Sequence, residues 1–418
     1  FAVTGLIASA AVTLIYFAVP LVAPPRPLEP TTVLGRLAAL ERSMSGAPGA
    51  FPAFHVLWPL ICADAWRSVR RSWGVAVSVW AVLIAVSCVT TGMHAIADVV
   101  FAAVLFPVFR HYEAVWAALR RGAERVANSW REWRLGPVRI INHGFYAGIG
   151  GAIGIWIAGR LAGGALLLPL VLVAVGALVA SVLWAQYVEG SSVLLRPLGW
   201  YGGLLGGLVT LGVLALLGFK VLVLMGALAV ALPWVQAAGR LRCLVQGCCH
   251  GGPAPSEAGI CYRHSRSRVT QIAGLTGVPI YPTPLYSILA NVVIGVILYR
   301  LWTLGAPAGL VIGLYFILSS VARFVEEAYR SEPQTPVFAR LHLYQWLALG
   351  GFAAGIIFTI VKASETPVPL GAADPRLVAF ALLVGIIGWF VTGVDFPGSS
   401  RRFSRLAPAD DPPRLLRR

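Results

Sequence analysis

The sequence predicts an all-α polytopic membrane protein with about 12 transmembrane helices in two helical modules. Of its 418 residues, 58% are hydrophobic and only 12% are charged, and long apolar runs recur along the whole chain. A soluble domain carries about twice this charged fraction. Because water cannot satisfy backbone groups inside a bilayer, spans of this composition have to be helices.

The charge distribution indicates a membrane surface rather than a nucleic acid as the partner. The net charge of +16 comes almost entirely from arginine, with lysine only at Lys220 and Lys362. In a polytopic protein, loop arginines set the topology and contact anionic lipid headgroups, so we expect no nucleic-acid partner. The first residue is Phe1 rather than Met, so we expect the true start of the chain to precede it and do not interpret this end as a signal peptide. This composition predicts a chain that crosses a membrane several times, and the family resemblance given below implies a bacterial inner membrane.

Composition divides the chain into successive segments. Residues 1–110 hold the first group of apolar spans, and residues 111–137 form a linker rich in arginine and tryptophan, typical of an amphipathic helix on a membrane surface. Residues 138–362 form the larger hydrophobic module. We expect one additional transmembrane helix in residues 363–400 and a basic tail in residues 401–418.

Two histidines and an aspartate stand at the starts of two predicted spans in the first module. His55 lies in FPAFHV, whereas His94 and Asp98 lie four residues apart in SCVTTGMHAIAD, on one face of a helix. The carboxylate can hold the His94 imidazole in one tautomer and make it a nucleophile, while the second histidine protonates a leaving oxygen. This layout suits phosphoryl transfer through a phosphohistidine. The alternative is that both histidines are interfacial residues without a chemical role.

These residues resemble motifs of the type 2 phosphatidic acid phosphatase superfamily, closest to its branch of inositol-phosphorylceramide and sphingomyelin synthases. The family patterns P-S-x-H and S-R-x-x-x-x-x-H-x-x-x-D align with residues 52–55 and 87–98. The resemblance implies that residues 1–110 form a lipid phosphatase or phosphotransferase module in which the two histidines and the aspartate are catalytic. Cys88 replaces the phosphate-binding arginine of the phosphatases, which favours the synthase branch.

A second concentration of polar residues lies in GRLRCLVQGCCHG, residues 239–251, with apolar runs on both sides. Charged groups and thiols are costly to place beside membrane helices, so they usually mark a site. Its polar and sulfur-containing residues are Arg240, Arg242, Cys243, Gln246, Cys248, Cys249 and His250.

The thiols of this segment allow several interpretations. Residue types that bind zinc are present at Cys243, Cys248, Cys249, His250, Cys261 and His264, although their spacing contains no C-x-x-C pair. A vicinal disulfide between Cys248 and Cys249, or a reactive thiol, is a second interpretation. A third is that these side chains line a substrate pocket. The sequence predicts no cofactor and no resident metal ion.

Five ordered blocks resemble the prolipoprotein diacylglyceryl transferase family. In the segment 239–251, Gly239, Arg240, Gly247 and Gly251 match the family loop G-R-I-G-N-F-x-N-G-E-x-x-G. The other blocks are VRIINHGFYAGIGGAIGIWIAGR (138–160), WYGGLLGG (200–207), YPTPLYS (281–287) and RFVEEAYR (323–330), with Gln345 fitting the glutamine of the last helix.

This resemblance implies an enzyme that holds a phospholipid such as phosphatidylglycerol, displaces its glycerol phosphate, and transfers the diacylglyceryl group to a thiol or another lipid or protein acceptor. Guanidinium groups bind phosphate through forked hydrogen bonds, and a glutamate four residues after an arginine can orient it. The expected catalytic residues are His143, Tyr201, Arg240, Arg323 and Glu327. The expected lipid-binding residues are Arg242, Gln246, Tyr286, Arg330 and Gln345.

The chain departs from the family pattern at several of these positions. Tyr201 replaces the histidine before Gly-Gly-Leu, His143 replaces the first-helix tyrosine, and Cys243 and Cys248 replace an asparagine and a glutamate. An exchange of roles between Tyr201 and His143 is a further hypothesis. The alternative function is a non-catalytic or metal-dependent lipid-binding or transport protein that keeps both folds. The arginine distribution places the 239–251 loop on the cytoplasmic side, whereas the family places it outside.

Overall fold

The protein forms two compact units, which comprise Phe1–Ala118 and Leu119–Arg418. The computed structural model describes residues 1–19, 31–33, 35–37, 39–40, 51–163, 166–187, 198–331, 337–360 and 374–395. The predicted basic tail, residues 401–418, lies outside the described residues.

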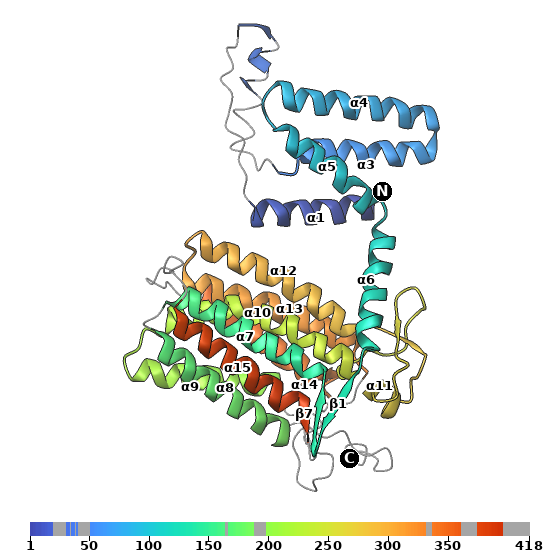
Figure 1. The fold of residues 1–418 in the computed structure, drawn as a ribbon. Helices are drawn as coiled ribbons and strands as arrows, with labels where there is room; N and C mark the ends of the chain where they lie inside the picture. Colours follow the sequence, from blue (N-terminus) through green and yellow to red (C-terminus); the bar gives the residue numbers. More distant parts are fainter. Residues whose placement is uncertain are drawn as a thin grey trace. The chain divides into compact units, whose positions relative to one another are not determined.

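The first unit is a group of apolar helices. Its helices are α1 (Ala2–Ala18), α3 (Phe54–Val69), α4 (Arg71–Thr90) and α5 (Ile96–Arg110) (Figure 1). Val12, Leu57 and Ala102, from three of these helices, share one buried cluster. Helix α6 (Tyr112–Ala127) follows α5 after a bend of 73°, within the segment predicted as a linker.

The second unit is a bundle of longer helices. They are α7 (His143–Ala162), α8 (Leu167–Tyr187), α9 (Trp200–Leu216), α10 (Val221–Gln246), α12 (Thr283–Thr303), α13 (Ala308–Tyr329), α14 (Leu343–Ile360) and α15 (Pro375–Gly393). Helix α7 packs between α10 and α15, α12 packs against α10, and α13 packs against α14. Leu224, Val230, Leu298 and Ile312 are fully buried in the common core of this unit.

Short strands join the ends of these helices. Strands β1 (Glu132–Leu135), β2 (Val138–Ile141) and β7 (Val394–Asp395) form an antiparallel sheet that ties the start of α7 to the end of α15. The segment between α10 and α12 contains β3 (Ile260–Cys261), the short helix α11 (Arg268–Gln271) and β4 (Pro279–Ile280). Strands β5 (Val337–Phe338) and β6 (Leu341–His342) pair just before α14.

The predicted all-α polytopic fold is confirmed. Among the described residues, eight helices are long and apolar enough to cross a membrane, or nine if the bent pair α5 and α6 is one span. Each of the predicted spans contains a helix, but α1, α3, α5 and α9 have only 15 to 17 residues. Run length overcounts complete spans because it does not show where the backbone turns. Helix α9, for example, ends just before Gly218, whose φ is 85°.

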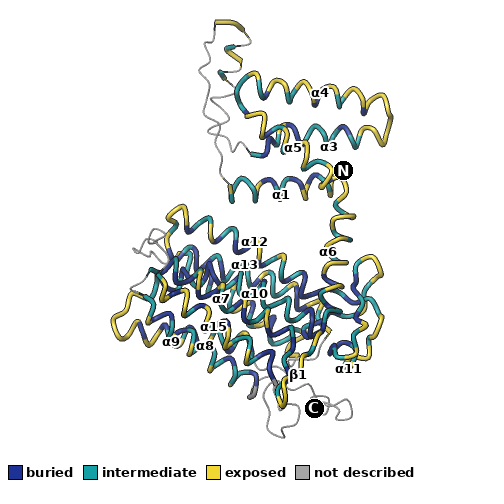
Figure 2. The backbone as a smooth tube through the Cα atoms, in the orientation of Figure 1, coloured by how far each residue is buried: buried dark blue, intermediate teal, exposed yellow. Residues whose placement is uncertain are grey.

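The outer faces of the bundle have the chemistry of a lipid-facing surface. Figure 2 shows exposed residues along the outward sides of the helices. On α8 these include Leu168, Leu172, Val175, Val179 and Leu183, each between 42% and 62% exposed and spaced by three or four residues. Such an apolar stripe at helical spacing is covered in a soluble protein and faces hydrocarbon in a membrane protein.

Glycines allow α7 and α15 to approach each other closely. A Cβ atom on Gly148 would lie 2.6 Å from the Gly385 carbonyl oxygen and 3.0 Å from Trp389 Cβ. Close backbone approach of this kind replaces hydrophobic burial as a source of helix association within lipid. The small-residue pattern GIGGAIG is therefore a packing surface.

We expect Gly148→Ala to destabilise the bundle by about 1–3 kcal/mol, because the added methyl group forces the two helices apart. Thermal unfolding in detergent micelles measures this as a lower Tm. The matched control is Gly350→Ala on α14, where an added Cβ meets nothing within 4 Å. That variant should unfold at or slightly above the wild-type temperature, since alanine is the better helix former. Equal Tm values for Gly148→Ala and wild type would contradict the packing role.

Candidate functional site

The chain reverses direction at the end of α10, between Cys243 in its last turn and Cys248 and Cys249 after it. Gly247 has φ 72° and donates its N–H to the Cys243 carbonyl oxygen (2.9 Å), which caps the helix. Glycine is the residue that adopts this left-handed conformation without a steric cost. Cys249 also has a positive φ, 61°, which is uncommon for a residue with a side chain. The turn therefore brings Cys248 and Cys249 back toward the last turn of α10.

The loop after this turn is held between two other helices. The Gly251 N–H donates to the Tyr281 carbonyl oxygen (3.2 Å), just before α12, and the Ser331 N–H donates to the His250 carbonyl oxygen (3.2 Å), just after α13. His250 is buried, and its Nδ1 lies 3.0 Å from the Gly251 carbonyl oxygen. Backbone pairing to both neighbours fixes the loop, so the side chains on it have a defined position.

Three arginines and two glutamates form a continuous network beside this loop. Arg240 Nη2 lies 3.2 Å and Arg323 Nη1 lies 2.9 Å from Glu326 Oε1, so the two guanidinium groups converge on one carboxylate oxygen. Arg323 Nη2 lies 2.6 Å and Arg330 Nη1 lies 3.1 Å from Glu327 Oε2. We name these five residues the Arg–Glu cluster.

The side chains of the Arg–Glu cluster are largely buried. The side chains of Glu326, Glu327 and Arg330 are 6%, 5% and 3% exposed, and those of Arg240 and Arg323 are 15% exposed. Buried charges need partners, and here three cations share two anions, which leaves one net positive charge. Among the described residues, Nε and Nη2 of Arg330 have no hydrogen-bond partner. The cluster therefore offers both charge and donors to an anion.

Residues from α9, α12 and α14 position the arginines. Arg240 Nε donates to Ser287 Oγ (2.9 Å). The guanidinium group of Arg323 lies over the Tyr344 ring, 5.1 Å from its centroid, and interacts electrostatically with Tyr201. The Tyr201 and Tyr344 rings stack at 4.8 Å, and the Tyr201 hydroxyl lies 3.4 Å from the Tyr344 carbonyl oxygen. Tyr201 thus belongs to the surroundings of the cluster, and its catalytic role stays a prediction.

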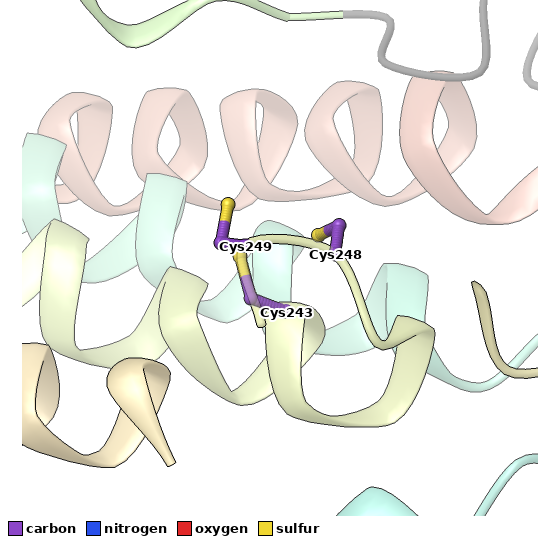
Figure 3. Close-up of side chains that lie close together, drawn as sticks. All are labelled: Cys243, Cys248 and Cys249. Atoms are coloured by element: carbon purple, nitrogen blue, oxygen red, sulfur yellow. The ribbon is translucent and has the colours of Figure 1, made fainter. Parts of the chain in front are cut away.

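Three thiols gather at the end of α10. The Sγ atoms of Cys243, Cys248 and Cys249 all lie within 4.8 Å of one another (Figure 3). Hydrogen bonds from the Cys243 and Cys248 thiols hold the pKa of Cys249 well below its ordinary value, and the charges of Arg330 and Arg240 act in the same direction. The three residues do not form a disulfide.

His143 belongs to a different group of side chains. It is buried, with its ring edge-to-face against Trp130 at 4.9 Å, and it interacts electrostatically with Arg242 and Arg139. The structure therefore places the predicted residues His143 and Arg242 together. The ring neighbours of His143 and Tyr201 differ, and the exchange of roles between these two residues stays a hypothesis.

The remaining predicted lipid-binding residues have structural contacts. Gln345 Oε1 accepts the His342 N–H (3.0 Å) at the start of α14, next to Tyr344 of the stacked pair. The Tyr286 ring lies edge-on to Tyr329 at 6.0 Å. Gln246 is buried in the last turn of α10.

A model of a known protein family matches the part of the chain that contains these groups. The family is described as prolipoprotein diacylglyceryl transferase, and the match covers residues 132–361. The chain belongs to the prolipoprotein diacylglyceryl transferase family. The match takes in the Arg–Glu cluster, the three thiols and His143, whereas Trp130 lies just before it.

Two relatives in this family come from clostridia. Phosphatidylglycerol–prolipoprotein diacylglyceryl transferase 2 of Clostridium perfringens (strain 13 / Type A) is 27% identical over 179 residues, which are 42% of this chain and 67% of the relative. Phosphatidylglycerol–prolipoprotein diacylglyceryl transferase of Clostridium tetani (strain Massachusetts / E88) is 25% identical over 162 residues, 38% of this chain and 62% of the relative. The chain thus spans about two thirds of the length of each.

Part of this candidate site has no assigned role in the sequence patterns. They assign no role to Glu326, although this carboxylate joins Arg240 to Arg323. The spacing of three residues from Arg323 was a usable signal, since residues three apart on a helix are neighbours. Ser287 and Tyr344 were also missed. Their roles depend on contacts between different helices, which no local pattern shows.

The first unit holds the predicted histidines and aspartate together, outside the residues matched by the family. His55 Nδ1 lies 3.4 Å from His94 Nε2, and His94 Nδ1 lies 3.6 Å from Asp98 Oδ2. His94 and Asp98 are buried, whereas His55 is exposed. The Ala53 N–H donates to the Asp98 carbonyl oxygen (3.2 Å), which ties the start of α3 to α5. The three side chains therefore form a chain that ends at solvent.

We expect Glu326→Gln to lower the stability of the bundle by about 3 kcal/mol, because it leaves two buried guanidinium groups close together without their shared anion. The loss should appear as a lower Tm in detergent micelles. Glu257→Gln, a change at an exposed carboxylate of the same unit, should leave the Tm within the error of wild type. A Tm for Glu326→Gln equal to that of the control would show that the pairing does not stabilise the fold.

Proposed function

We propose that the chain transfers a diacylglyceryl group from an anionic phospholipid, phosphatidylglycerol or a similar lipid, to a thiol acceptor. The observation that carries this proposal is the convergence of Arg240 and Arg323 on Glu326 inside the Arg–Glu cluster. Membership of the transferase family supports the reaction class, and the names of the two relatives include both the donor and a prolipoprotein. Bacterial relatives and the many apolar helices support placement in a bacterial inner membrane.

In the proposed reaction, the Arg–Glu cluster holds the lipid phosphate and stabilises the leaving group. The acceptor sulfur attacks the glyceryl carbon, so that a C–S bond forms while the C–O bond to the phosphate breaks. The electron pair of that bond leaves on the glycerol phosphate, whose growing negative charge the guanidinium groups neutralise. Arg330 has unpartnered donors for phosphate oxygens among the described residues, and the Arg323 guanidinium group lies against the Tyr344 ring. The catalytic role of His143 stays a prediction.

We expect Arg240→Ala to lower the transfer rate by about 100-fold or more, since removing one preorganised donor to a developing charge has an effect of this size. The measurement uses the purified chain, radiolabelled phosphatidylglycerol and a cysteine-containing prolipoprotein peptide, with thioether lipid as the product. Arg240→Lys should recover only part of the rate, because lysine lacks the forked geometry. Arg376→Ala, at an exposed arginine of α15, is the matched control and should retain full activity.

Absence of thioether lipid with the wild-type chain would reject the transferase proposal. If the same protein still binds phosphatidylglycerol in an Arg240-dependent way, the alternative of a non-catalytic lipid-binding or transport protein is correct. Equal transfer rates for Arg240→Ala and the Arg376→Ala control would show that the Arg–Glu cluster does not take part in the reaction.

A second activity is supported by the chain of His55, His94 and Asp98 in the first unit. Asp98 faces Nδ1 of the His94 ring, which leaves Nε2, 3.4 Å from His55 Nδ1, as the atom proposed to attack a lipid phosphate. A phosphorus–nitrogen bond forms while the phosphate ester bond breaks, and His55 gives a proton to the leaving oxygen. We propose that this unit is a phosphatase or phosphotransferase module for lipid headgroups, similar to the type 2 phosphatidic acid phosphatases.

We expect His94→Ala to abolish phosphate release from lipid phosphate esters, and Asp98→Asn to slow it by about 100-fold or more, because the nucleophile loses its orienting carboxylate. His111→Ala, at an exposed histidine of the same unit, is the matched control. The measurement is release of inorganic phosphate from phosphatidic acid in mixed micelles. Release by His94→Ala at the wild-type rate would remove this mechanism.

A further inference from the structure

The three thiols at the end of α10 have no part in binding the lipid phosphate, yet they form the most concentrated group of metal ligands in the described residues. Their Sγ atoms lie within 4.8 Å of one another. A tetrahedral zinc ion with Zn–S bonds of about 2.3 Å separates its sulfur ligands by about 3.8 Å. A small inward rotation of the side chains therefore brings all three sulfurs to bonding distance of one ion.

We propose that Cys243, Cys248 and Cys249 bind a Zn²⁺ ion as thiolates, and that the fourth coordination position of this ion receives the acceptor thiol. The second part rests on the proposed transferase function, whereas the first part does not.

The backbone holds these ligands in place before any ion binds. Cys243 sits in the last turn of a long helix, and the left-handed Gly247 and Cys249 return the chain so that the three Sγ atoms lie within 4.8 Å of one another. The Cys249 carbonyl oxygen accepts the Thr283 hydroxyl (2.5 Å) from the first turn of α12. A ligand set fixed by packed helices binds an ion more tightly than a set on a free loop. The positive φ of Cys249 is the kind of backbone strain that concentrates at functional sites.

The electrostatics favour a complex of this charge. Zn²⁺ with three thiolates carries a net charge of −1, and the adjacent Arg–Glu cluster carries a net charge of +1. Arg240 and Arg330 both interact electrostatically with the Cys249 sulfur. Partners of this kind around the first ligands neutralise the complex and raise its affinity.

The number of ligands indicates a reactive ion rather than a purely structural one. Among the described residues, the group contains three ligands and no fourth histidine, cysteine or carboxylate. Structural zinc sites are closed by four protein ligands, whereas catalytic sites keep one position for water or substrate. An acceptor thiol that binds there loses its proton to solvent. Its sulfur then attacks the glyceryl carbon as described above, with no change in the oxidation state of the metal.

The metal site is tested on the full-length chain, purified under reducing conditions and loaded with Zn²⁺. We expect one zinc per chain by elemental analysis, and sulfur-to-metal charge-transfer absorption when Co²⁺ replaces it. We expect the zinc affinity to fall by more than about tenfold in each of Cys243→Ser, Cys248→Ser and Cys249→Ser. Loss of a residue that only hydrogen-bonds to a metal ligand already lowers metal affinity by about tenfold. Cys261→Ser and Cys62→Ser are the matched controls, because both thiols lie outside the group. No stoichiometric zinc, or equal affinity in all variants, would overturn the site.

The open position is tested with the Co²⁺-loaded chain and two peptides that differ only in a cysteine or a serine at the acceptor position. We expect the cysteine peptide to increase the charge-transfer absorption and the serine peptide to leave it unchanged. An unchanged spectrum with the cysteine peptide would overturn the acceptor role. Cysteine-dependent zinc binding together with this response, but without thioether product, would reject the transferase proposal and leave the metal site standing.

Discussion

The second unit depends on the pairing of buried arginines with two adjacent glutamates at the end of α13. Glu326 and Glu327 sit on consecutive positions and so point in different directions, one toward α10 and one toward the end of their own helix. Without them, three cations would face one another where water has little access. Pairing with the two glutamates stabilises the three buried arginines. The one positive charge that is left over can receive an anion, and this charge connects the packing of the bundle to its proposed chemistry.

A second constraint is the reversal of the chain after α10. The left-handed turn at Gly247 ends the longest helix of the described residues and delivers the loop to the ends of α12 and α13. One backbone feature thus places the Arg–Glu cluster and the three thiols side by side, because Arg240 and Cys243 precede the turn and Cys249 follows it. Arg240 can therefore keep its place in the cluster although Cys243 and Cys248 replace the asparagine and the glutamate of the family loop.

The candidate site was predictable where function and local spacing coincide. The sequence identified Arg240, Arg323 and Glu327 because each belongs to a recognisable block, and it identified His94 with Asp98 because residues four apart share a helix face. It named His143 and Tyr201 as catalytic residues of one module; their ring neighbours in the structure differ, and both roles stay predictions. Matching two positions to one family pattern does not show which neighbours each side chain has in this chain.

By itself, the sequence determined the all-α membrane fold and the order of its helices, since long apolar runs leave the backbone no alternative inside a bilayer. It also determined which residue types are available for chemistry. Only the tertiary structure decided that Arg240 and Arg323, far apart in the chain, share the single carboxylate of Glu326, and that three thiols with no recognisable ligand spacing meet at one point. Contacts between different helices depend on how they pack and where each one ends, and neither property is encoded in a local pattern.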